Sequence, residues 1–193
     1  MSIAPSTSTA EGTLTPGTWT LDQHHSSVTF SVRHLGLSRV RGRFDRFAAT
    51  LDAGASIADS RVSVTIDVAS VNTNDPDRDV HLRSTQFFSA ELHPEIRFAS
   101  NEVTGEGQTW KISGDLSLNG VTQPMTFEVE FHGIEMFPLD QKRHLGFSAT
   151  GVIRRSVYGI ELGLVPLSSN RLMLDDDVKI EIDVQFIEPE AIV

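Results

Sequence analysis

Apolar and polar residues alternate along most of this chain, a pattern typical of β-strands that bury one face. In residues 26–34, for example, Val28, Phe30 and Val32 share one face, and His34 falls on the same face. Similar segments recur along the chain and are separated by turn residues. We expect strands within residues 17–22, 26–34, 37–52, 60–70, 94–103, 109–120, 125–133, 145–153 and 178–186. The pattern therefore predicts an all-β protein of roughly eight to ten strands.

The connections between these segments are short, which favours antiparallel pairing because a parallel crossover needs a much longer connection. A sheet of this many strands closes into a barrel or packs as a sandwich to protect its edges. A barrel of about eight strands is either filled by side chains or holds one small ligand. The inward positions combine large rings with small residues: Phe30, Phe127, Phe147, Gly114, Ala149 and Gly151. The small residues either accommodate the taper of a filled barrel or leave room for a ligand, and both interpretations stay open.

One predicted strand breaks the alternation. Phe44 and Phe47 are three residues apart, so a regular strand would point their rings to opposite faces. A β-bulge, or a sharp bend after Gly42, would return both rings to the interior. We expect such an irregularity within residues 37–52.

The stretch "NTNDPDRDVHLRSTQFF" interrupts the period of two and carries the signals of a short helix. Asn74 or Asp75 is a suitable N-cap, and Pro76 suits the first helical position. Asp79 and Arg83 are spaced for an i,i+4 ion pair, which would stabilise the helix.

The end of this stretch is aromatic. A short helix followed by Phe87 and Phe88 would flank or plug one mouth of a barrel and would place His81 near the rim. The sequence therefore predicts a helical lid.

Length and composition narrow the class of protein. The chain has 193 residues, which suits a single domain, and it contains no cysteine, which excludes disulfides, thiolate nucleophiles and cysteine-based zinc sites. A net charge of −10 argues against a nucleic-acid partner and against capture by anionic lipid through a polybasic surface. We expect a disordered tail over residues 1–16, a barrel domain over 17–187 and a C-terminal tail over 188–193.

The N-terminal residues lack the basic and apolar regions of a signal peptide, and no apolar run is long enough for a membrane-spanning helix. We therefore expect a cytoplasmic protein.

No catalytic or metal-binding motif stands out. His24 and His25 are adjacent, so in a strand they would point to opposite faces and make poor co-ligands. The chain has no HExxH, no G-x-S-x-G nucleophile elbow and no P-loop. We expect no metal site and no cofactor.

Several polar residues have both a structural and a functional interpretation. Arg39, Arg41 and Arg43 alternate, so they either form a solvated outer face or lie near a mouth and hold an anionic head group. His34, on the apolar face of its strand, is either a satisfied core histidine or a ligand contact.

Five segments together resemble the YceI-like family. They are "GTWTLDQHHSSVTFSVRHLG", "VRGRFDRF", "VNTNDPDRDVHLRSTQFFSAELHPEIRF", "GDLSLNGVTQPMTFEVEF" and "GFSATGVIRRSVYGI". The resemblance runs from about Gly17 to Phe186. It implies an extended, lipocalin-like antiparallel β-barrel that encloses an apolar tunnel for a polyisoprenoid chain, with a polyprenyl phosphate or an isoprenoid quinone as ligand and no catalytic activity.

The chain departs from the resemblance in two respects. Many relatives carry an export signal, which is not visible here. A motif that usually reads Arg-Ser-(Asp)-Phe-Gly is here "RRSVYG", with Val157 and Tyr158, and this difference would alter one end of the barrel.

These observations predict a protein that binds, stores or transports an isoprenoid lipid, with no enzymatic activity. The residues expected to line the tunnel are Phe30, Phe44, Phe87, Phe88, Phe98, Phe127 and Phe147. The residues expected to contact the head group are His34, Arg78, His81 and, as a weaker candidate, Arg43.

Two alternatives remain. One is an enzyme that acts on a small lipophilic substrate with His81 and Asp79 as an acid–base pair. The other is a barrel with a filled core that acts through its surface. Barrel edges near the basic segment would permit a homodimer in any of these cases.

Overall fold

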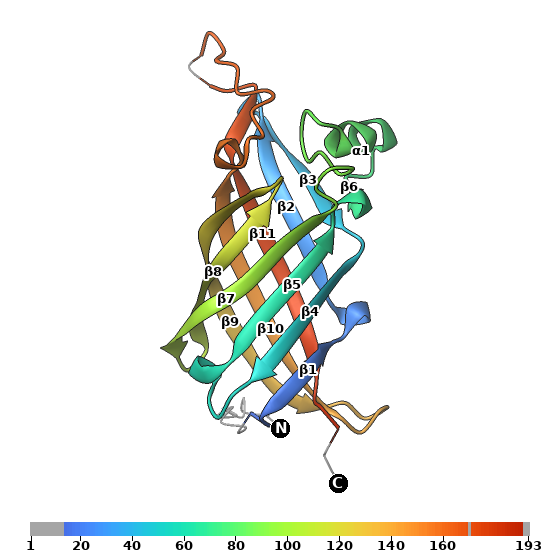
Figure 1. Cartoon of the computed structure of the whole chain (residues 1–193), viewed down its shortest axis with the longest axis vertical. Helices are drawn as coiled ribbons and strands as arrows, with labels where there is room; N and C mark the ends of the chain where they lie inside the picture. The colour runs from blue at the N-terminus through green and yellow to red at the C-terminus, as the bar shows by residue number, and fades with distance from the viewer. Residues whose placement is uncertain (1–13, 170, 191–193) are drawn as a thin grey trace, which may run out of the picture.

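The computed structural model describes residues 14–169 and 171–190 as one extended β-barrel with a short helix at one end (Figure 1). The strands are β1 (Gly17–Leu21), β2 (Ser27–His34), β3 (Ser38–Phe44), β4 (Phe47–Ala53), β5 (Arg61–Asp67), β6 (Val71–Asn72), β7 (Glu95–Glu106), β8 (Thr109–Leu118), β9 (Val121–Met136), β10 (Arg143–Arg154) and β11 (Leu174–Ile187). The helix is α1 (Pro76–Arg83), and the 3-10 turns are η1 (Gln23–His25), η2 (Ile57–Asp59), η3 (Val68–Ser70) and η4 (Arg155–Tyr158).

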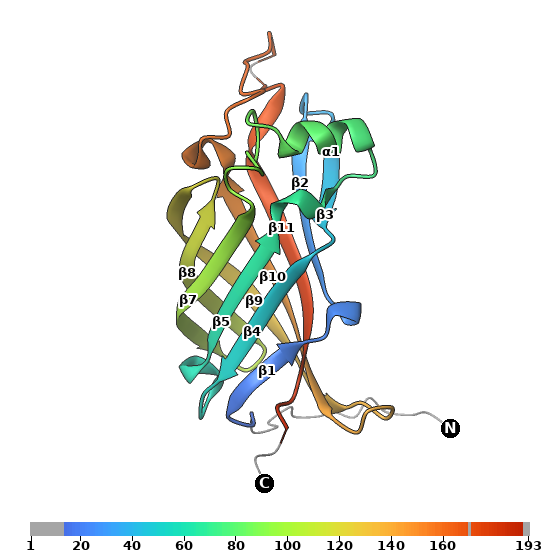
Figure 2. The ribbon, with the colours of Figure 1, turned by 45° about the vertical axis from the view of Figure 1, so that its right-hand side comes forward.

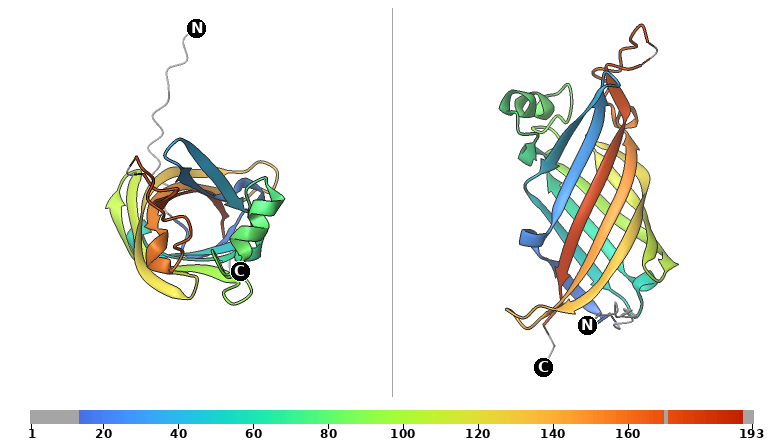
Figure 3. Two further views of the ribbon diagram at one scale, coloured as in Figure 1. Left: turned by 90° about the horizontal axis from the view of Figure 1, so that it is seen from above. Right: turned by 180° about the vertical axis from the view of Figure 1, so that it is seen from behind.

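The barrel closes because β11 pairs with three strands. The closed ring of eight antiparallel strands runs β1–β4–β5–β7–β8–β9–β10–β11, and β11 returns to β1 at the pair Leu21–Phe186. Further along, β11 pairs with β2 at Val178–Val32, and β2 continues through β3 to β6. Seen from behind in Figure 3, β2, β11 and β10 lie side by side along the wall. The prediction of an all-β antiparallel barrel of about eight strands with a short helix is confirmed.

The irregularity expected within residues 37–52 divides this segment into two strands. β3 ends at Phe44 and β4 begins at Phe47, with a bend at Asp45. The bend is held by backbone hydrogen bonds, from Asp45 N to Ser70 O at 3.1 Å and from Asp67 N to Arg46 O at 3.0 Å. Both phenylalanine rings line the interior cavity, so the inward orientation is confirmed, although the break lies three residues beyond Gly42.

Two of the small inward residues do not leave room for a ligand. A Cβ atom on Gly114 would lie 2.2 Å from the carbonyl oxygen of Ala99, where the register of β7 and β8 shifts. A Cβ atom on Gly151 would lie 2.3 Å from Cε of Met125. Neighbouring atoms therefore fill these two gaps, whereas Ala149 does face the cavity.

The end of the barrel that carries the chain termini is closed by packed side chains. They are the buried residues Leu14, Trp19, Leu51, Ala53, Phe131, Leu145 and Phe186, which we call the floor. Trp19 and Leu145 are 0% exposed, and the indole Nε1 of Trp19 donates to Thr15 O at 2.9 Å. Of the predicted N-terminal tail, Leu14 packs in this floor, Thr15 accepts the hydrogen bond from Trp19, and residues 1–13 lie outside the described residues.

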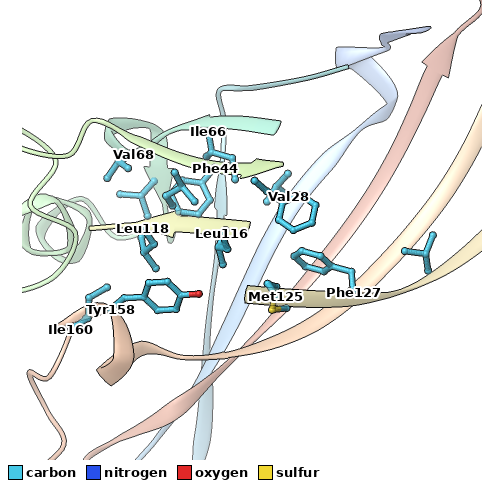
Figure 4. Packing of buried hydrophobic residues seen from close by; sticks show 14 residues of the cluster. Val28, Phe44, Ile66, Val68, Leu116, Leu118, Met125, Phe127, Tyr158 and Ile160 are labelled. Carbon is cyan, nitrogen blue, oxygen red and sulfur yellow. The ribbon is translucent and has the colours of Figure 1, made fainter. Parts of the chain in front are cut away.

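The opposite end of the barrel, which we call the mouth, is flanked by α1 and η4 (Figure 2). Seen from above in Figure 3, α1 lies over one side of the ring of strands. A second cluster of buried apolar residues, which is drawn in Figure 4, extends from the mouth into the barrel. Two apolar clusters thus follow each other along the barrel axis, and the cavity described below lies between their side chains.

Candidate ligand-binding cavity

The barrel encloses a cavity of about 220 Å³. Its wall takes side chains from α1, from the 3-10 turns η2 and η4, and from every strand of the closed ring except β1. It reaches from Leu14 and Phe186 at the floor to Leu82 and Phe87 at the mouth. Apart from Thr29, Ser60 and Arg155, every residue of the wall is hydrophobic. A small volume enclosed by so long a wall is a narrow bore rather than a round pocket.

All seven phenylalanines expected to line a tunnel are part of this wall. They are Phe30, Phe44, Phe87, Phe88, Phe98, Phe127 and Phe147. Ring contacts join several of them, with centroid distances of 5.5 Å for Phe30–Phe44, 6.0 Å for Phe44–Phe88 and 5.3 Å for Phe98–Phe127. Because alternate strand residues face inward, the period of two was sufficient to place the strand phenylalanines.

The lid is built as its sequence predicts. Asp75 is the N-cap, and its side chain accepts a hydrogen bond from Arg78 N at 3.1 Å, with Pro76 at the start of the helix. After the helix the chain turns back, with Phe88 N donating to Leu82 O at 3.0 Å. This turn directs Leu82, Phe87 and Phe88 into the cavity wall.

One contact expected within the lid is wrong. Asp79 does not pair with Arg83; its carboxylate is buried and accepts hydrogen bonds from Thr73 N at 2.8 Å and from Thr73 Oγ1 at 2.6 Å. Asp79 therefore joins the helix to the loop before it and makes no ion pair among the described residues.

None of the four residues expected to contact a head group is part of the cavity wall. His34 lies at the end of β2 beyond the cavity and is exposed. Arg78 donates to Thr73 Oγ1 at 2.7 Å, and Arg43 donates to Asp45 at 2.6 Å. His81 is exposed, lies 2.7 Å from Gln86 Oε1, and packs its ring against Phe87. Their contact with a ligand stays a prediction, and for Arg78 and Arg43 the structure supplies protein partners instead.

Sequence reasoning missed the charged residue of the wall, Arg155. It is 4% exposed, and burial lowers the pKa of its guanidinium, although the nearby Asp176 and Asp175 oppose this effect. Its nitrogens donate to four backbone carbonyls, those of Asp175, Ile160, Leu162 and Leu174, at 2.7–2.9 Å. The only signal in the sequence was the unusual "RRSVYG" segment, which gives no indication of burial.

The acid–base pair of the enzyme hypothesis is not assembled. Asp79 is buried and bonded to Thr73, whereas His81 is exposed and bonded to Gln86. Over residues 14–169 and 171–190 no group of three or more His, Asp or Glu side chains could hold a metal ion. No helix within the same residues is long and apolar enough to cross a membrane.

Known proteins share both the sequence and the fold. The YceI-like domain family matches residues 19–186. UPF0312 proteins of Staphylococcus aureus are 36% identical over 169 residues, which is 87% of this chain and 96% of the relative. The crystal structure of a Campylobacter jejuni YceI protein is 31% identical and covers 82% of this chain and 90% of its own, with a TM-score of 0.70.

Two further crystal structures show the same fold at lower identity. Burkholderia cenocepacia BcnA is 22% identical, with a TM-score of 0.74 over 86% of this chain and 98% of its own. A polyisoprenoid-binding domain from Saccharophagus degradans is 18% identical, with a TM-score of 0.65 over 89% of this chain and 98% of its own. With most of its length matched by the family and by these relatives, the chain belongs to the YceI-like family.

Proposed function

We propose that this protein binds an isoprenoid lipid, a polyprenyl phosphate or an isoprenoid quinone, with the isoprenoid chain inside the barrel, and that it stores or transports this lipid. The observation that carries the proposal is the composition of the cavity wall, which has only three polar residues, Thr29, Ser60 and Arg155. Each methylene that moves from water into such a wall contributes about 0.8 kcal/mol, so a chain of several isoprene units would bind tightly with few polar contacts.

The shape of the cavity favours a chain over a compact ligand. Drug-sized molecules usually occupy pockets of about 300–1,000 Å³. The cavity here is smaller, about 220 Å³, and yet its wall extends from the floor to the lid. A flexible chain fills a narrow bore of this kind, whereas a rigid multi-ring molecule does not.

The family supports the same class of ligand. The structurally similar domain from Saccharophagus degradans is described as polyisoprenoid-binding and as implicated in plant cell wall breakdown. We propose for this chain only the class of ligand, since the identity to that domain is 18%.

Binding without catalysis is the form of the proposal that the geometry favours. The one charged side chain of the wall, Arg155, donates to backbone carbonyls, and no carboxylate or histidine is part of the wall. An acid–base reaction inside the cavity would lack a proton acceptor of ordinary strength.

The test combines lipid extraction with a variant that fills the bore. Organic extracts of the purified protein are analysed by mass spectrometry, and binding of added decylubiquinone and geranylgeranyl phosphate is titrated. Ala149→Phe places a ring into the cavity and should abolish binding, whereas Thr150→Phe, at the next and exposed position of β10, should retain it. Failure of the wild-type protein both to yield a lipid and to bind either probe would refute the proposal.

A further inference from the structure

Two polar side chains of the η4 turn project into the apolar end of the barrel near the mouth. Arg155 is part of the cavity wall, and Tyr158 belongs to the buried cluster that surrounds the cavity. Both are at least nine-tenths buried, with exposed fractions of 4% for Arg155 and 2% for Tyr158. Buried polar groups normally form hydrogen bonds. We therefore compared the hydrogen bonds that each of these two side chains makes with the number that it can make.

The guanidinium of Arg155 has one N–H group more than it has hydrogen-bond acceptors. A guanidinium carries five N–H groups. Nε and the two N–H groups of Nη1 donate to Asp175 O, Ile160 O and Leu162 O, and Nη2 donates to Leu174 O. Leu174 O is the one acceptor of Nη2 among the described residues, so the second N–H of Nη2 is left over.

The hydroxyl of Tyr158 is also unused. The backbone oxygen of Tyr158 accepts from Asn119 Nδ2 at 2.9 Å, but its hydroxyl has no hydrogen bond within the described residues. Figure 4 shows the hydroxyl pointing inward, toward Leu116 and Met125, and Leu116 is part of the cavity wall. Burial raises the pKa of this tyrosine, so the hydroxyl stays protonated and able to donate.

We propose that Tyr158, together with the spare N–H of Arg155, binds a hydrogen-bond-accepting oxygen at the polar end of the lipid. This inference rests on the proposed function and specifies its ligand as a chain that ends in an acceptor oxygen, whether a quinone carbonyl or a phosphate. The polar end then lies inside the barrel at η4. It does not lie on the outer surface, where His34 and His81 are exposed.

The physical reason is the cost of unused donors. Every fully buried side-chain polar atom of the described residues has a hydrogen-bond partner, so the hydroxyl of Tyr158, which has none, borders accessible space. A donor that faces an apolar cavity has little access to water, and leaving it without an acceptor costs free energy. A ligand oxygen that reaches both donors removes this cost, whereas a pure hydrocarbon leaves it in place. The cavity should therefore discriminate between lipids by the end of the chain, while the apolar wall accepts any chain of suitable width.

Tyr158→Phe is the sharpest variant, because it removes one oxygen atom that has no partner in the protein. Arg155 is unsuitable, since two of its four hydrogen bonds hold the loop that follows η4 and the other two hold the start of β11. Affinities of wild type and variant are measured for decylubiquinone, geranylgeranyl phosphate and phytane, a hydrocarbon without any oxygen. We expect Tyr158→Phe to weaken binding of one or both oxygenated probes roughly 3- to 10-fold, the effect of one hydrogen bond, and to leave phytane unchanged. The probe that is affected identifies a carbonyl or a phosphate as the acceptor.

Thr29→Val is the matched control. Thr29 is also on the cavity wall, but its hydroxyl already donates to Glu181 O at 3.0 Å, so its loss should not change the preference among the probes. Equal affinities of wild type and Tyr158→Phe for both oxygenated probes, or an equal loss for all three probes, would overturn the inference. Wild-type protein that binds phytane as tightly as the oxygenated probes would overturn it too, while leaving the proposed function standing. Absence of binding to all three would instead remove the proposed function itself.

Discussion

The carboxylate of Asp79 accepts two hydrogen bonds from Thr73, one from its backbone N–H at 2.8 Å and one from its hydroxyl at 2.6 Å. The same threonine accepts from Arg78 Nε at 2.7 Å through its hydroxyl oxygen, and its carbonyl accepts from Arg78 Nη2 at 3.0 Å. Two charged residues of α1, Arg78 and Asp79, thus hold the loop that precedes the helix through hydrogen bonds to Thr73. These bonds fix the start of α1, and the turn that directs Phe87 and Phe88 to the mouth of the cavity follows the other end of this helix.

Removal of the Asp79 carboxylate should therefore loosen the lid. Asp79→Ala leaves the buried N–H and hydroxyl of Thr73 without an acceptor, and we expect a loss of about 2–3 kcal/mol in the free energy of unfolding. Urea denaturation measures this loss, and limited proteolysis should show faster cleavage between α1 and β7.

Asp77→Ala is the control for the lid. Asp77 lies in the same first turn but is exposed and has no hydrogen bond or ion pair among the described residues. Its loss should change stability by no more than about 0.5 kcal/mol. Equal effects of the two substitutions would show that the helix dipole, and not the contact with Thr73, explains the role of Asp79.

The lid shows where sequence reasoning succeeds and where it stops. The cap, the proline and the aromatic end could be predicted because they depend on neighbours in the chain. The bond from Asp79 to Thr73 could not, since it joins the helix to a loop whose path is set by β6 and the barrel. The i,i+4 spacing of Asp79 and Arg83 suggested the wrong partner because surface pairs are weak and a buried hydrogen bond outcompetes them.

The floor of the barrel should contribute more to stability than the wall of the cavity. Trp19 is fully buried in the floor, whereas Trp110 is partly exposed and borders the cavity. Trp19→Ala should cost about 3–5 kcal/mol, as expected for a large residue removed from a packed core. Trp110→Ala should cost clearly less, because one side of its ring already faces empty space. Denaturant unfolding of both variants tests this order, and the reverse order would contradict the division into floor and cavity.

Close approach between β7 and β8 should make Gly114 irreplaceable. A Cβ atom at this position would lie 2.2 Å from the backbone oxygen of Ala99, which cannot move without breaking the sheet. We expect Gly114→Ala to destabilise the protein by roughly 2–3 kcal/mol, the upper part of the range for overpacked cores. Gly146→Ala is the control, because its Cβ would meet only the side chain of His132, at 3.7 Å. Thermal unfolding should separate the two variants, and similar midpoints would contradict this account.

The apolar wall of the candidate site could be predicted from the sequence, whereas its polar residues could not, and the reason is physical. Inward phenylalanines follow from the period of two, which needs no knowledge of distant contacts. Arg155 escaped detection because its partners are backbone carbonyls, those of Ile160 and Leu162 in the loop after η4 and those of Leu174 and Asp175 on β11, and a carbonyl leaves no mark on the amino-acid sequence. His34 was selected for its place on the apolar face of its strand and His81 for its place near the rim, but both residues are exposed to solvent.

The anchor of η4 should make stability depend on pH. Burial tends to raise the pKa of Asp176, but hydrogen bonds from Ser156 Oγ at 2.7 Å and Ser156 N at 2.9 Å, together with the charges of Arg155 and Arg154, lower the pKa below its ordinary 3.8. A pKa depressed in the folded state means that this contribution to stability is present above about pH 4 and is lost as the pH falls through the folded value. Asp176→Asn should therefore lower the free energy of unfolding by about 1 kcal/mol at pH 7.

The difference between Asp176→Asn and wild type should shrink as the pH falls, because protonation removes the same charge from the wild-type protein. Urea unfolding of both proteins at several pH values between 7 and 3 measures this difference in the free energy of unfolding. Asp22 is a second carboxylate with a lowered pKa, which burial opposes and hydrogen bonds from His25 and from the His24 backbone N–H produce. Asp22 lies at the other end of the barrel and is present in both wild type and Asp176→Asn. Its titration therefore cancels from the difference in unfolding free energy between these two proteins. A gap between wild type and Asp176→Asn that stayed constant down to pH 3 would mean that the charge of Asp176 does not stabilise η4.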